Sequence, residues 1–367
     1  MNIRKPDEIL RCLLDAGFAA YYVGGCVRDT LLGRSIHDWD VATSARPEQI
    51  TALFSHCVPT GMQHGTVTVL FGETQAEVTS FRRETGYCDS RHPDSVQFVT
   101  DLQSDLARRD FTVNAMAMDL DGRITDLFGG RDDLARGVIR CVGNPAHRFG
   151  EDALRMLRAY RFCAQLGFSM DDAAAQAIEA CAPLCAKLSR ERVREETEKT
   201  LISPNPGNVT RMAELGLLCA CGVTRCAELS SLAGLSAAPE VRWTAWKLLQ
   251  PELSLDDFRL PSNICRQAAR VCAAWQPQRD RLSWKRLIAA EGWDTARLSA
   301  RVAQSTAIDA IAGSGECVTL SQLAVTGRDF PQLTGKAVGQ TLHMLLQHVL
   351  EHPQDNTREI LLQLAQK

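Results

Sequence analysis

The spacing of apolar residues changes along the chain. Up to about residue 140, several short runs alternate between apolar and polar positions, most clearly Thr66–Phe71 and Ala76–Phe81. Such alternation predicts strands, and Gly72 between these two runs predicts a hairpin. Beyond residue 140 the apolar residues recur at helical spacing, and no convincing strand run appears. We therefore predict a mixed α+β part followed by a helical remainder.

Shorter elements are predicted before residue 82. Residues 3–17 place acidic residues inside an apolar pattern of helical spacing, which predicts an amphipathic helix and not a signal peptide. Tyr21–Val23 predicts a strand that leads into a glycine pair, and Val41–Ser44 predicts the end of another strand. Pro47–Phe54 predicts a second helix.

The end of the mixed part is marked by turn-rich sequence. Arg82–Pro93, RRETGYCDSRHP, is polar, charged and without a period, which predicts a loop. Asp126–Leu134 and Val138–Cys141 predict a turn, a short helix and a strand. Because only helical spacing follows, we predict a domain boundary near residue 140.

Gly24-Gly25 opens the segment GGCVRD directly after a predicted strand. Glycines allow a tight turn whose N–H groups face an anion. If Thr30–Arg34 continues as a helix, its N-terminus adds a partial charge that favours phosphate. A glycine pair by itself is more often only a turn.

Asp38 and Asp40 are two residues apart. On a strand this spacing places both carboxylates on one face. Two carboxylates beside a phosphate cradle are what a pair of Mg²⁺ ions needs to hold a triphosphate. A lone pair of this kind is more often a solvated strand. Glu77 is either a third carboxylate beside the pair or a solvent-facing strand residue.

The segment RRDFTVNAMA, residues 108–117, carries further polar groups. Arg109 offers a forked donor for phosphate, and Asp110 can accept from a ribose hydroxyl. Asn114 can brace the loop. The alternative is an ion-paired helix start with Asp110 as its N-cap.

Phe149–Leu166, FGEDALRMLRAYRFCAQL, predicts one amphipathic helix. Arg155, Arg158 and Arg161 lie opposite its apolar side, with Asp152 at their edge. Asp152 and Arg155 are three residues apart, so they are predicted neighbours on the helix. The apolar stripe is formed by Met156, Leu157, Tyr160, Cys163 and Ala164.

An Asp/Arg pair can select a base. Cytosine and adenine both present an exocyclic amine beside a bare ring nitrogen, so a carboxylate accepts from the amine while Arg donates to the nitrogen. Guanine and uracil reverse both groups and would be refused. The alternative for Asp152 and Arg155 is an ordinary ion pair within a helix.

Composition excludes several classes of protein. The 367 residues are 45% hydrophobic and 23% charged, and no apolar run approaches the roughly 20 residues of a membrane span. The net charge of −3 requires any nucleic-acid contact to come from local basic patches. Fourteen scattered cysteines without a secretion signal suggest reduced thiols and a cytoplasmic protein. Zinc at Cys219, Cys221 and Cys226 is a weak alternative, because a second ligand pair is missing.

With these segments in this order, the chain resembles the nucleotidyltransferase superfamily related to DNA polymerase β. It resembles more closely the bacterial class II CCA-adding enzyme and poly(A) polymerase family, densely over residues 20–200 and weakly over 318–363. The resemblance implies an α+β, polymerase-β-like catalytic head at 1–140. A helical neck at 141–204, a helical body at 205–300 and a helical, tRNA-contacting tail at 301–367 would follow.

The implied reaction is template-independent transfer of CMP and AMP from CTP and ATP to the 3′ end of tRNA, with release of pyrophosphate. Asp38 and Asp40 would be the catalytic residues and would hold Mg²⁺. Other residues that match the family motifs would have further roles. Gly25, Arg28 and Arg109 would position phosphates, and Asp152 and Arg155 would choose the base. Arg158 and Arg161 would lie near the triphosphate.

Other segments also resemble parts of this family. Arg82–Pro93 resembles the mobile loop used in moving from C to A addition. Ser189–Lys199 resembles a motif that braces the neck, although a capped, solvated helix also explains it. Thr334-Gly335-Lys336 resembles the tail that contacts tRNA, or is a plain helix start. We expect the tryptophans of the helical remainder to be core anchors, namely Trp243, Trp246, Trp275, Trp284 and Trp293.

Two kinds of alternative stay open. An A-only tRNA nucleotidyltransferase or a poly(A) polymerase would use the same chemistry on a different primer. A noncatalytic RNA-binding protein is expected to lack one carboxylate of the pair, whereas both Asp38 and Asp40 are present. A dinucleotide-binding module would need a GxGxxG pattern, which GGCVRD lacks.

Overall fold

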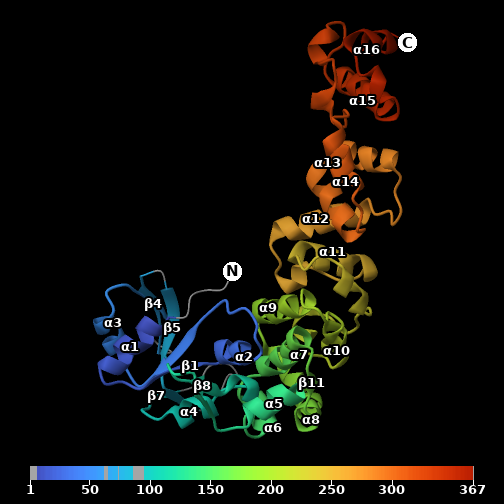
Figure 1. Ribbon diagram of the computed structural model, residues 1–367. Helices are drawn as coiled ribbons and strands as arrows, with labels where there is room; N and C mark the ends of the chain where they lie inside the picture. The colour runs from blue at the N-terminus through green and yellow to red at the C-terminus, as the bar shows by residue number, and fades with distance from the viewer. Residues whose placement is uncertain (1–5, 62–64, 73, 86–94, 367) are drawn as a thin grey trace. The chain divides into compact units, whose positions relative to one another are not determined.

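The computed structural model describes residues 6–61, 65–72, 74–85 and 95–366 (Figure 1). The chain forms two compact units. Unit 1 comprises Met1–Thr200 and Gly207–Cys226, and unit 2 comprises Leu201–Pro206 and Ala227–Lys367. The division into head, neck, body and tail stays a prediction. No helix in the described ranges combines the length and apolar character needed to cross a membrane.

A seven-stranded sheet in the order β3-β4-β5-β2-β1-β8-β9 organises the first part of unit 1 (Figure 1). Only β2 and β5 pair in parallel, with Asp40 opposite Glu77, and the other neighbours are antiparallel. The strands span Ala20–Val23 (β1), Asp40–Thr43 (β2), Cys57–Gly61 (β3), Thr66–Phe71 (β4), Thr74–Ser80 (β5), Met116–Met118 (β8) and Ile124–Asp126 (β9).

Alternation explains why these runs form strands with a buried face. In β4 and β5, Val67, Val69 and Val78 are fully buried, while Leu70 and Glu77 are exposed. The α+β prediction and the predicted hairpin of β4 and β5 are both confirmed. The strand β3 is an element that the sequence analysis did not predict.

Four short helices accompany the sheet. The amphipathic helix α1 buries Ile9, Leu10 and Leu13, as its spacing predicts. Its described part begins at Asp7 and ends at Asp15, so the residues before position 6 of the predicted helix lie outside the described residues. The other three helices are α2 (Gly25–Leu31), α3 (Pro47–Leu53) and α4 (Leu102–Ala107).

The helical part of unit 1 follows the sheet (Figure 1). It contains α5 (Gly130–Arg136), α6 (Pro145–Glu151), α7 (Leu154–Leu166), α8 (Asp172–Cys181), α9 (Arg190–Leu201) and α10 (Asn208–Glu214). Short 3₁₀ turns lie at Thr112–Asn114 (η2), Ala182–Lys187 (η3) and Cys219–Cys221 (η4). The predicted apolar stripe of α7 is confirmed, since all five of its residues are buried.

Unit 2 is helical throughout its described residues. Its helices are α11 (Pro239–Leu249), α12 (Ser262–Ala273), α13 (Arg281–Val302), α14 (Ala307–Ser314), α15 (Lys336–Glu351) and α16 (Arg358–Leu364). Gly292 interrupts α13 with a φ of 82°. Five 3₁₀ turns connect these helices, at Ser230–Gly234 (η5), Asp256–Phe258 (η6), Leu320–Gln322 (η7), Gly327–Asp329 (η8) and Pro353–Asp355 (η9).

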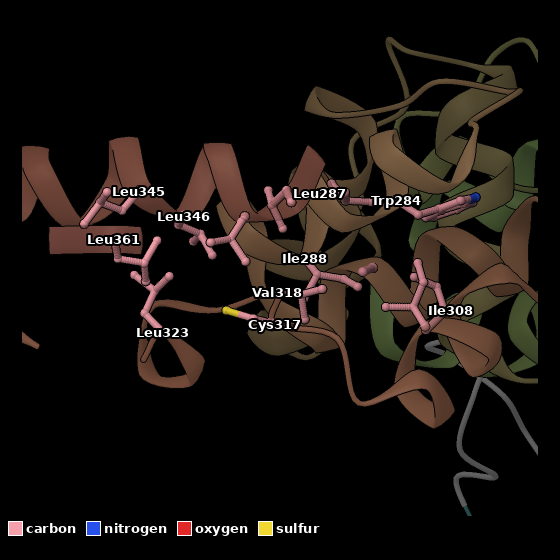
Figure 2. Close-up of a cluster of buried hydrophobic side chains, with 14 of the residues drawn as sticks. Trp284, Leu287, Ile288, Ile308, Cys317, Val318, Leu323, Leu345, Leu346 and Leu361 are labelled. Carbon is pink, nitrogen blue, oxygen red and sulfur yellow. The ribbon is translucent and has the colours of Figure 1, made fainter. Parts of the chain in front are cut away.

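Several groups of apolar side chains hold the described part of unit 2 together, and two of them contain tryptophans that are almost completely buried. Trp243 and Trp246 stack with ring centroids 5.3 Å apart, and Phe258 packs against both. Figure 2 shows the second group, in which Trp284 and residues of α13, α14, α15 and α16 come together. Three of the five predicted tryptophan anchors are therefore core residues, while Trp275 and Trp293 are partly buried.

Three sequence predictions of secondary structure are wrong. Arg82–Thr85 is a strand (β6) paired with Ser95–Phe98 (β7), although it was predicted as loop, and residues 86–93 of that stretch lie outside the described residues. The helical remainder contains a two-residue strand, Ser169–Met170 (β11), which pairs in parallel with Val138–Ile139 (β10). In both places the pairing partner lies outside the segment, so local periodicity carries no signal of it.

The third error concerns Phe149–Leu166, which is two helices and not one. Asp152 ends α6 with extended backbone angles, φ −141° and ψ 106°. Its Oδ1 accepts a hydrogen bond from the backbone N–H of Leu154 at 3.0 Å. Asp side chains commonly satisfy the unpaired N–H groups at a helix start, which favours a break at this position.

Candidate active site

A pocket of about 1010 Å³ lies within unit 1. Nine basic and five acidic side chains line it, a surplus of four positive charges that suits a polyanionic ligand. All nine residues selected from the sequence lie on its wall, namely Gly25, Arg28, Asp38, Asp40, Arg109, Asp152, Arg155, Arg158 and Arg161.

The acidic side of the pocket lies at the start of β2. Asp40 is the first residue of this strand, whereas Asp38 precedes it, so the two carboxylates do not share a strand as predicted. Glu77 of the neighbouring strand is opposite Asp40, exposed, and also lines the pocket. The two alternatives for Glu77 thus describe one placement, a solvent-facing strand residue beside the aspartates.

The Asp40 carboxyl has an unusual environment. Its pKa is raised to about 6, mainly by burial and also by repulsion from Glu77 and Asp38, while Arg109 acts in the opposite direction. A partly buried carboxylate with acidic neighbours is stabilised by a cation. The donor set at Asp38 and Asp40 therefore fits a divalent metal ion.

The number of protein ligands limits which metal site is possible. Among the described residues, no group of three or more His, Cys, Asp or Glu is arranged to hold a metal ion. Nothing in the described residues therefore supports zinc at Cys219, Cys221 and Cys226. Mg²⁺ needs only one or two carboxylates, because water and substrate phosphates complete its shell.

The glycine turn at Gly24 lies directly against the side chains of Arg109 and Asp40. Gly24 has a φ of 76°, in the region that favours glycine, and a Cβ there would lie 2.9 Å from Arg109 Nη1 and 3.4 Å from Asp40 Oδ2. Any other residue would be strained at this φ and would press against the end of the Arg109 side chain. Gly24 therefore allows Arg109 and Asp40 to approach the same turn.

The segment RRDFTVNAMA braces the basic side. Asn114 accepts a hydrogen bond from Arg28 Nη1 at 2.8 Å and contacts Asp110 Oδ1 at 3.4 Å, so it does hold this loop together. Arg109 Nη2 pairs with the buried Asp105 at 3.2 Å. These contacts orient both arginines before any ligand is present.

Asp110 is an ionised, buried acid and not a helix N-cap. Burial raises its pKa, but Arg158, at 2.6 Å from Oδ2, and the backbone N–H of Phe111 lower it to about 2. Asp110 is therefore charged at neutral pH. Its carboxylate anchors Arg158 at the pocket wall.

Asp152 and Arg155 do not pair with each other, contrary to the prediction. Arg155 Nη1 contacts Glu151 Oε2 at 2.5 Å, while Asp152 Oδ2 contacts Arg192 Nη2 at 3.0 Å. The helix break at Asp152 changes the spacing that would have made them neighbours. Both still face the same pocket, so they can act on one ligand.

Helix α9 contributes pocket residues that the sequence analysis did not select, since it interpreted this segment as either a neck-bracing motif or a solvated helix. Glu196 is only 4% exposed and binds Arg161 Nε at 2.5 Å, and Arg192 binds Asp152. Arg192 and Lys199 line the pocket. The missed signal is their spacing, because Arg192, Glu196 and Lys199 at i, i+4 and i+7 share one helix face. Arg82 and Arg108 also line the pocket and were not selected.

Comparison with known proteins gives two matching families along the chain. Residues 20–140 match the Poly A polymerase head domain. Residues 167–220 match the family described as the probable RNA and SrmB-binding site of polymerase A. Together the two matches cover the sheet, α2 and α9, whereas α6 and α7 lie between the matched ranges.

Individual relatives extend the similarity. A CCA-adding enzyme of Enterococcus faecalis (strain ATCC 700802 / V583) is 38% identical over 393 residues, which cover 100% of this chain and 96% of the relative. One from Lactobacillus helveticus (strain DPC 4571) is 54% identical over 201 residues, 55% of this chain. The latter match spans about half the length of that relative, 50%.

The fold has close counterparts among experimental structures. The crystal structure of the Bacillus stearothermophilus CCA-adding enzyme in complex with CTP matches with a TM-score of 0.81 and 33% identity. The match covers 95% of this chain and 94% of that one. A Thermotoga maritima CCA-adding enzyme, at 20% identity and a TM-score of 0.66, shares the fold.

Proposed function

This chain belongs to the CCA-adding enzyme family, and we propose that it adds CMP and AMP from CTP and ATP to the 3′ end of tRNA without a template, releasing pyrophosphate. The observation that carries this proposal is the pocket of unit 1. A carboxylate pair, a glycine turn and a set of anchored arginines meet there around one space. This is the arrangement that nucleotidyl transfer from a triphosphate requires.

The metal ions of this proposal are Mg²⁺, held by Asp38 and Asp40. When bound, they lower the pKa of the primer 3′-hydroxyl and neutralise charge on the triphosphate. The partly buried Asp40, with its raised pKa and acidic neighbours, supports this assignment. The turn at Gly24 keeps Arg109 beside the same carboxylate.

The phosphates would lie against the basic wall. Arg28 and Arg109 are preoriented by Asn114 and Asp105, so little ordering is needed on binding. Gly25 leaves the backbone open to a phosphate oxygen. Arg158 and Arg161 would complete the wall near the triphosphate, each anchored by a carboxylate.

Asp152 and Arg155 would choose the base. An ionised carboxylate has about four acceptor sites. The N–H of Leu154 and Arg192 Nη2 use two of those of Asp152, which leaves capacity for the exocyclic amine of cytosine or adenine. Arg155 would donate to the neighbouring ring nitrogen. Guanine and uracil would face two repulsive contacts.

The remaining assignments belong to the same proposal. The chain would divide into a head at 1–140, a neck at 141–204, a body at 205–300 and a tail at 301–367. Thr334 and Gly335 precede α15, which begins at the exposed Lys336 and has Gly335 as its N-cap, an arrangement that suits contact with a tRNA backbone phosphate. A cytoplasmic location follows from the proposed tRNA substrate.

One experiment tests the function and its alternatives. The purified protein with Mg²⁺ is given tRNA ending before CCA, tRNA ending after both Cs, or complete tRNA, each with CTP, ATP or both. Products are sized on a denaturing gel. We expect the first tRNA to be extended by CTP and then by a single A.

The other outcomes identify the alternatives. Extension only of the tRNA that already carries both Cs would indicate an A-only enzyme. A long ladder with ATP on any RNA would indicate a poly(A) polymerase. Tight RNA binding without extension, at protein and Mg²⁺ concentrations that saturate, would overturn the proposal in favour of a noncatalytic RNA-binding protein.

A further inference from the structure

Three guanidinium groups of the pocket surround one aromatic ring. The Cζ atoms of Arg161, Arg28 and Arg158 lie 3.9, 5.3 and 5.5 Å from the centroid of the Phe162 ring. All three distances are within the range of a cation–π contact. The arginines come from two separate elements, α2 and α7, and all three line the pocket together with Phe162.

We propose that Phe162 is a positioning residue, whose electron-rich ring holds these three arginines together for the triphosphate. This inference rests on the proposed function, because it names the device that prepares the same pocket for its nucleotide. It assigns a role to a side chain that by sequence is an apolar residue of an amphipathic helix.

The charges explain why such a device is needed. Each arginine has its own carboxylate at ion-pair distance, Asp29 for Arg28, Asp110 for Arg158 and Glu196 for Arg161. Three like charges around one point repel one another, and more strongly where water is excluded. The negative face of an aromatic ring attracts all three without using a hydrogen-bond donor.

The ring is itself fixed in place. Phe162 is 5% exposed, and Phe111, which is fully buried, meets it edge to face with centroids 5.7 Å apart and an interplanar angle of 79°. A ring held in this way keeps its cations in place before the nucleotide arrives. A leucine would fill similar space but would offer no such face.

The number of cations sets this ring apart from others in the described chain. In unit 2, Arg279 lies over Trp284 and Arg297 lies over Trp293, one cation for each ring. Such single contacts are common in folded proteins. Three contacts on one ring, all on a pocket wall, indicate a function beyond packing.

The test changes the electrons of the ring and keeps its shape. Mono-, di- and trifluorophenylalanine are placed at position 162 of the full chain, because fluorine withdraws charge from the ring face. The dissociation constant of CTP is measured by calorimetry, and kcat and KM for CTP and ATP by tRNA extension. We expect KM and the dissociation constant to rise stepwise, by about tenfold in total, with a smaller change in kcat.

A matched control separates electrostatics from packing. Phe149 of α6 is fully buried, and no guanidinium is recorded over its ring in the described part of the chain. The same three analogues at position 149 should leave CTP binding unchanged. Phe162→Leu should resemble the trifluoro analogue, and Phe162→Tyr, which keeps an electron-rich face, should retain most of the affinity.

The inference is overturned if CTP affinity is constant along the series at position 162, or if the series at position 149 changes it equally. Failure of the proposed function would look different. Wild-type protein would then extend no tRNA, whereas the calorimetric series with CTP would still decide the role of Phe162. Thermal unfolding of each analogue confirms that the compared proteins are folded.

Discussion

The two units use buried charge in different ways. In unit 1 the buried guanidinium groups of Arg155 and Arg161 bind the carboxylates of Glu151 and Glu196 around an open pocket. In unit 2 the buried Arg242 donates to backbone carbonyls, those of Ser236, Leu201, Ala233 and Leu235, at 2.9–3.3 Å. Lys285 of the same unit donates to the carbonyl of Leu350 and pairs with Glu316.

This difference separates function from architecture. A carboxylate is a partner that a phosphate can replace or share, so the arginines of unit 1 remain able to bind a ligand. A backbone carbonyl is part of the fold, and an arginine that binds four of them holds chain segments in place. Buried charge alone therefore does not mark a functional site. A carboxylate partner beside an open pocket does, since Lys285 also pairs with the carboxylate of Glu316 but does not line the pocket.

The largest effect on activity is expected at Asp40, in the acidic part of the unit 1 pocket. Asp40→Asn should reduce the rate of CMP addition by a factor on the order of 10³ or more, because the metal contribution is worth several kcal/mol. Folding should be unimpaired. Burial raises the pKa of Asp40 to about 6, above its usual 3.8, so its ionised form destabilises the fold above that pH.

Single-turnover rates with Mg²⁺ and urea unfolding at about pH 8 measure the two effects. A rate within tenfold of wild type would remove Asp40 from the metal site. An equal or higher free energy of unfolding is expected, because the amide has the shape of the carboxylate without its charge.

For Arg242 of unit 2 we expect a loss of stability and little loss of activity, the opposite of the result expected for Asp40. Arg242→Met should lower the free energy of unfolding by about 3–5 kcal/mol, since several buried carbonyls lose their donor. Transfer activity per folded molecule should change little by comparison. Arg301→Met is the matched control, because Arg301 is largely exposed, pairs with Glu240 and should contribute only about 0–1 kcal/mol.

Chemical unfolding followed by tryptophan fluorescence reports on this unit, whose core contains Trp243 and Trp246. Equal stability of both variants would contradict a structural role for Arg242. If Arg242→Met lost more activity than folded protein, Arg242 would have a functional role, and the proposed difference between the two units would be wrong.

Base choice should change by an intermediate amount. Asp152→Ala should reduce the preference for CTP over UTP by about 10- to 100-fold, since an unsatisfied polar contact is worth about 1–3 kcal/mol. The ratio of kcat/KM values for the two nucleotides measures it. Asp171→Asn, at the N-cap of α8, is a control that should leave the ratio unchanged. An unchanged ratio in Asp152→Ala would exclude this residue from base selection.

The smallest effect is expected at the ion pairs of unit 2. Hydrogen bonds from Lys285 and Arg281 lower the pKa of Glu316 from 4.5 to about 2. Its stabilisation is therefore fully present above pH 4.5 and is lost as the pH falls towards 2. Glu316→Gln should cost about 1–2 kcal/mol near neutral pH and almost nothing at the acid end. The melting temperatures of the wild type and Glu316→Gln should converge as the pH falls across this range. A constant difference between them would contradict the stabilising role assigned to the Glu316 carboxylate.

Local features of the sequence determined much of this protein. Alternation gave the hairpin of β4 and β5, and helical spacing gave α1 and the buried stripe of α7. Short motifs gave nine residues that do line one pocket. These predictions succeed because backbone period and side-chain chemistry are properties of a few neighbouring residues.

Only the tertiary structure decided which of these residues meet. Asp152 forms an ion pair with Arg192 of α9, forty positions away, and not with Arg155. Arg82–Thr85 is a strand because Ser95–Phe98 pairs with it. Phe162 gathers guanidinium groups from α2 and α7. The free energy of such contacts depends on burial and on partners distant in the chain, so no local spacing specifies them. The sequence determined the chemistry of the pocket, and the fold decided how its charges are paired.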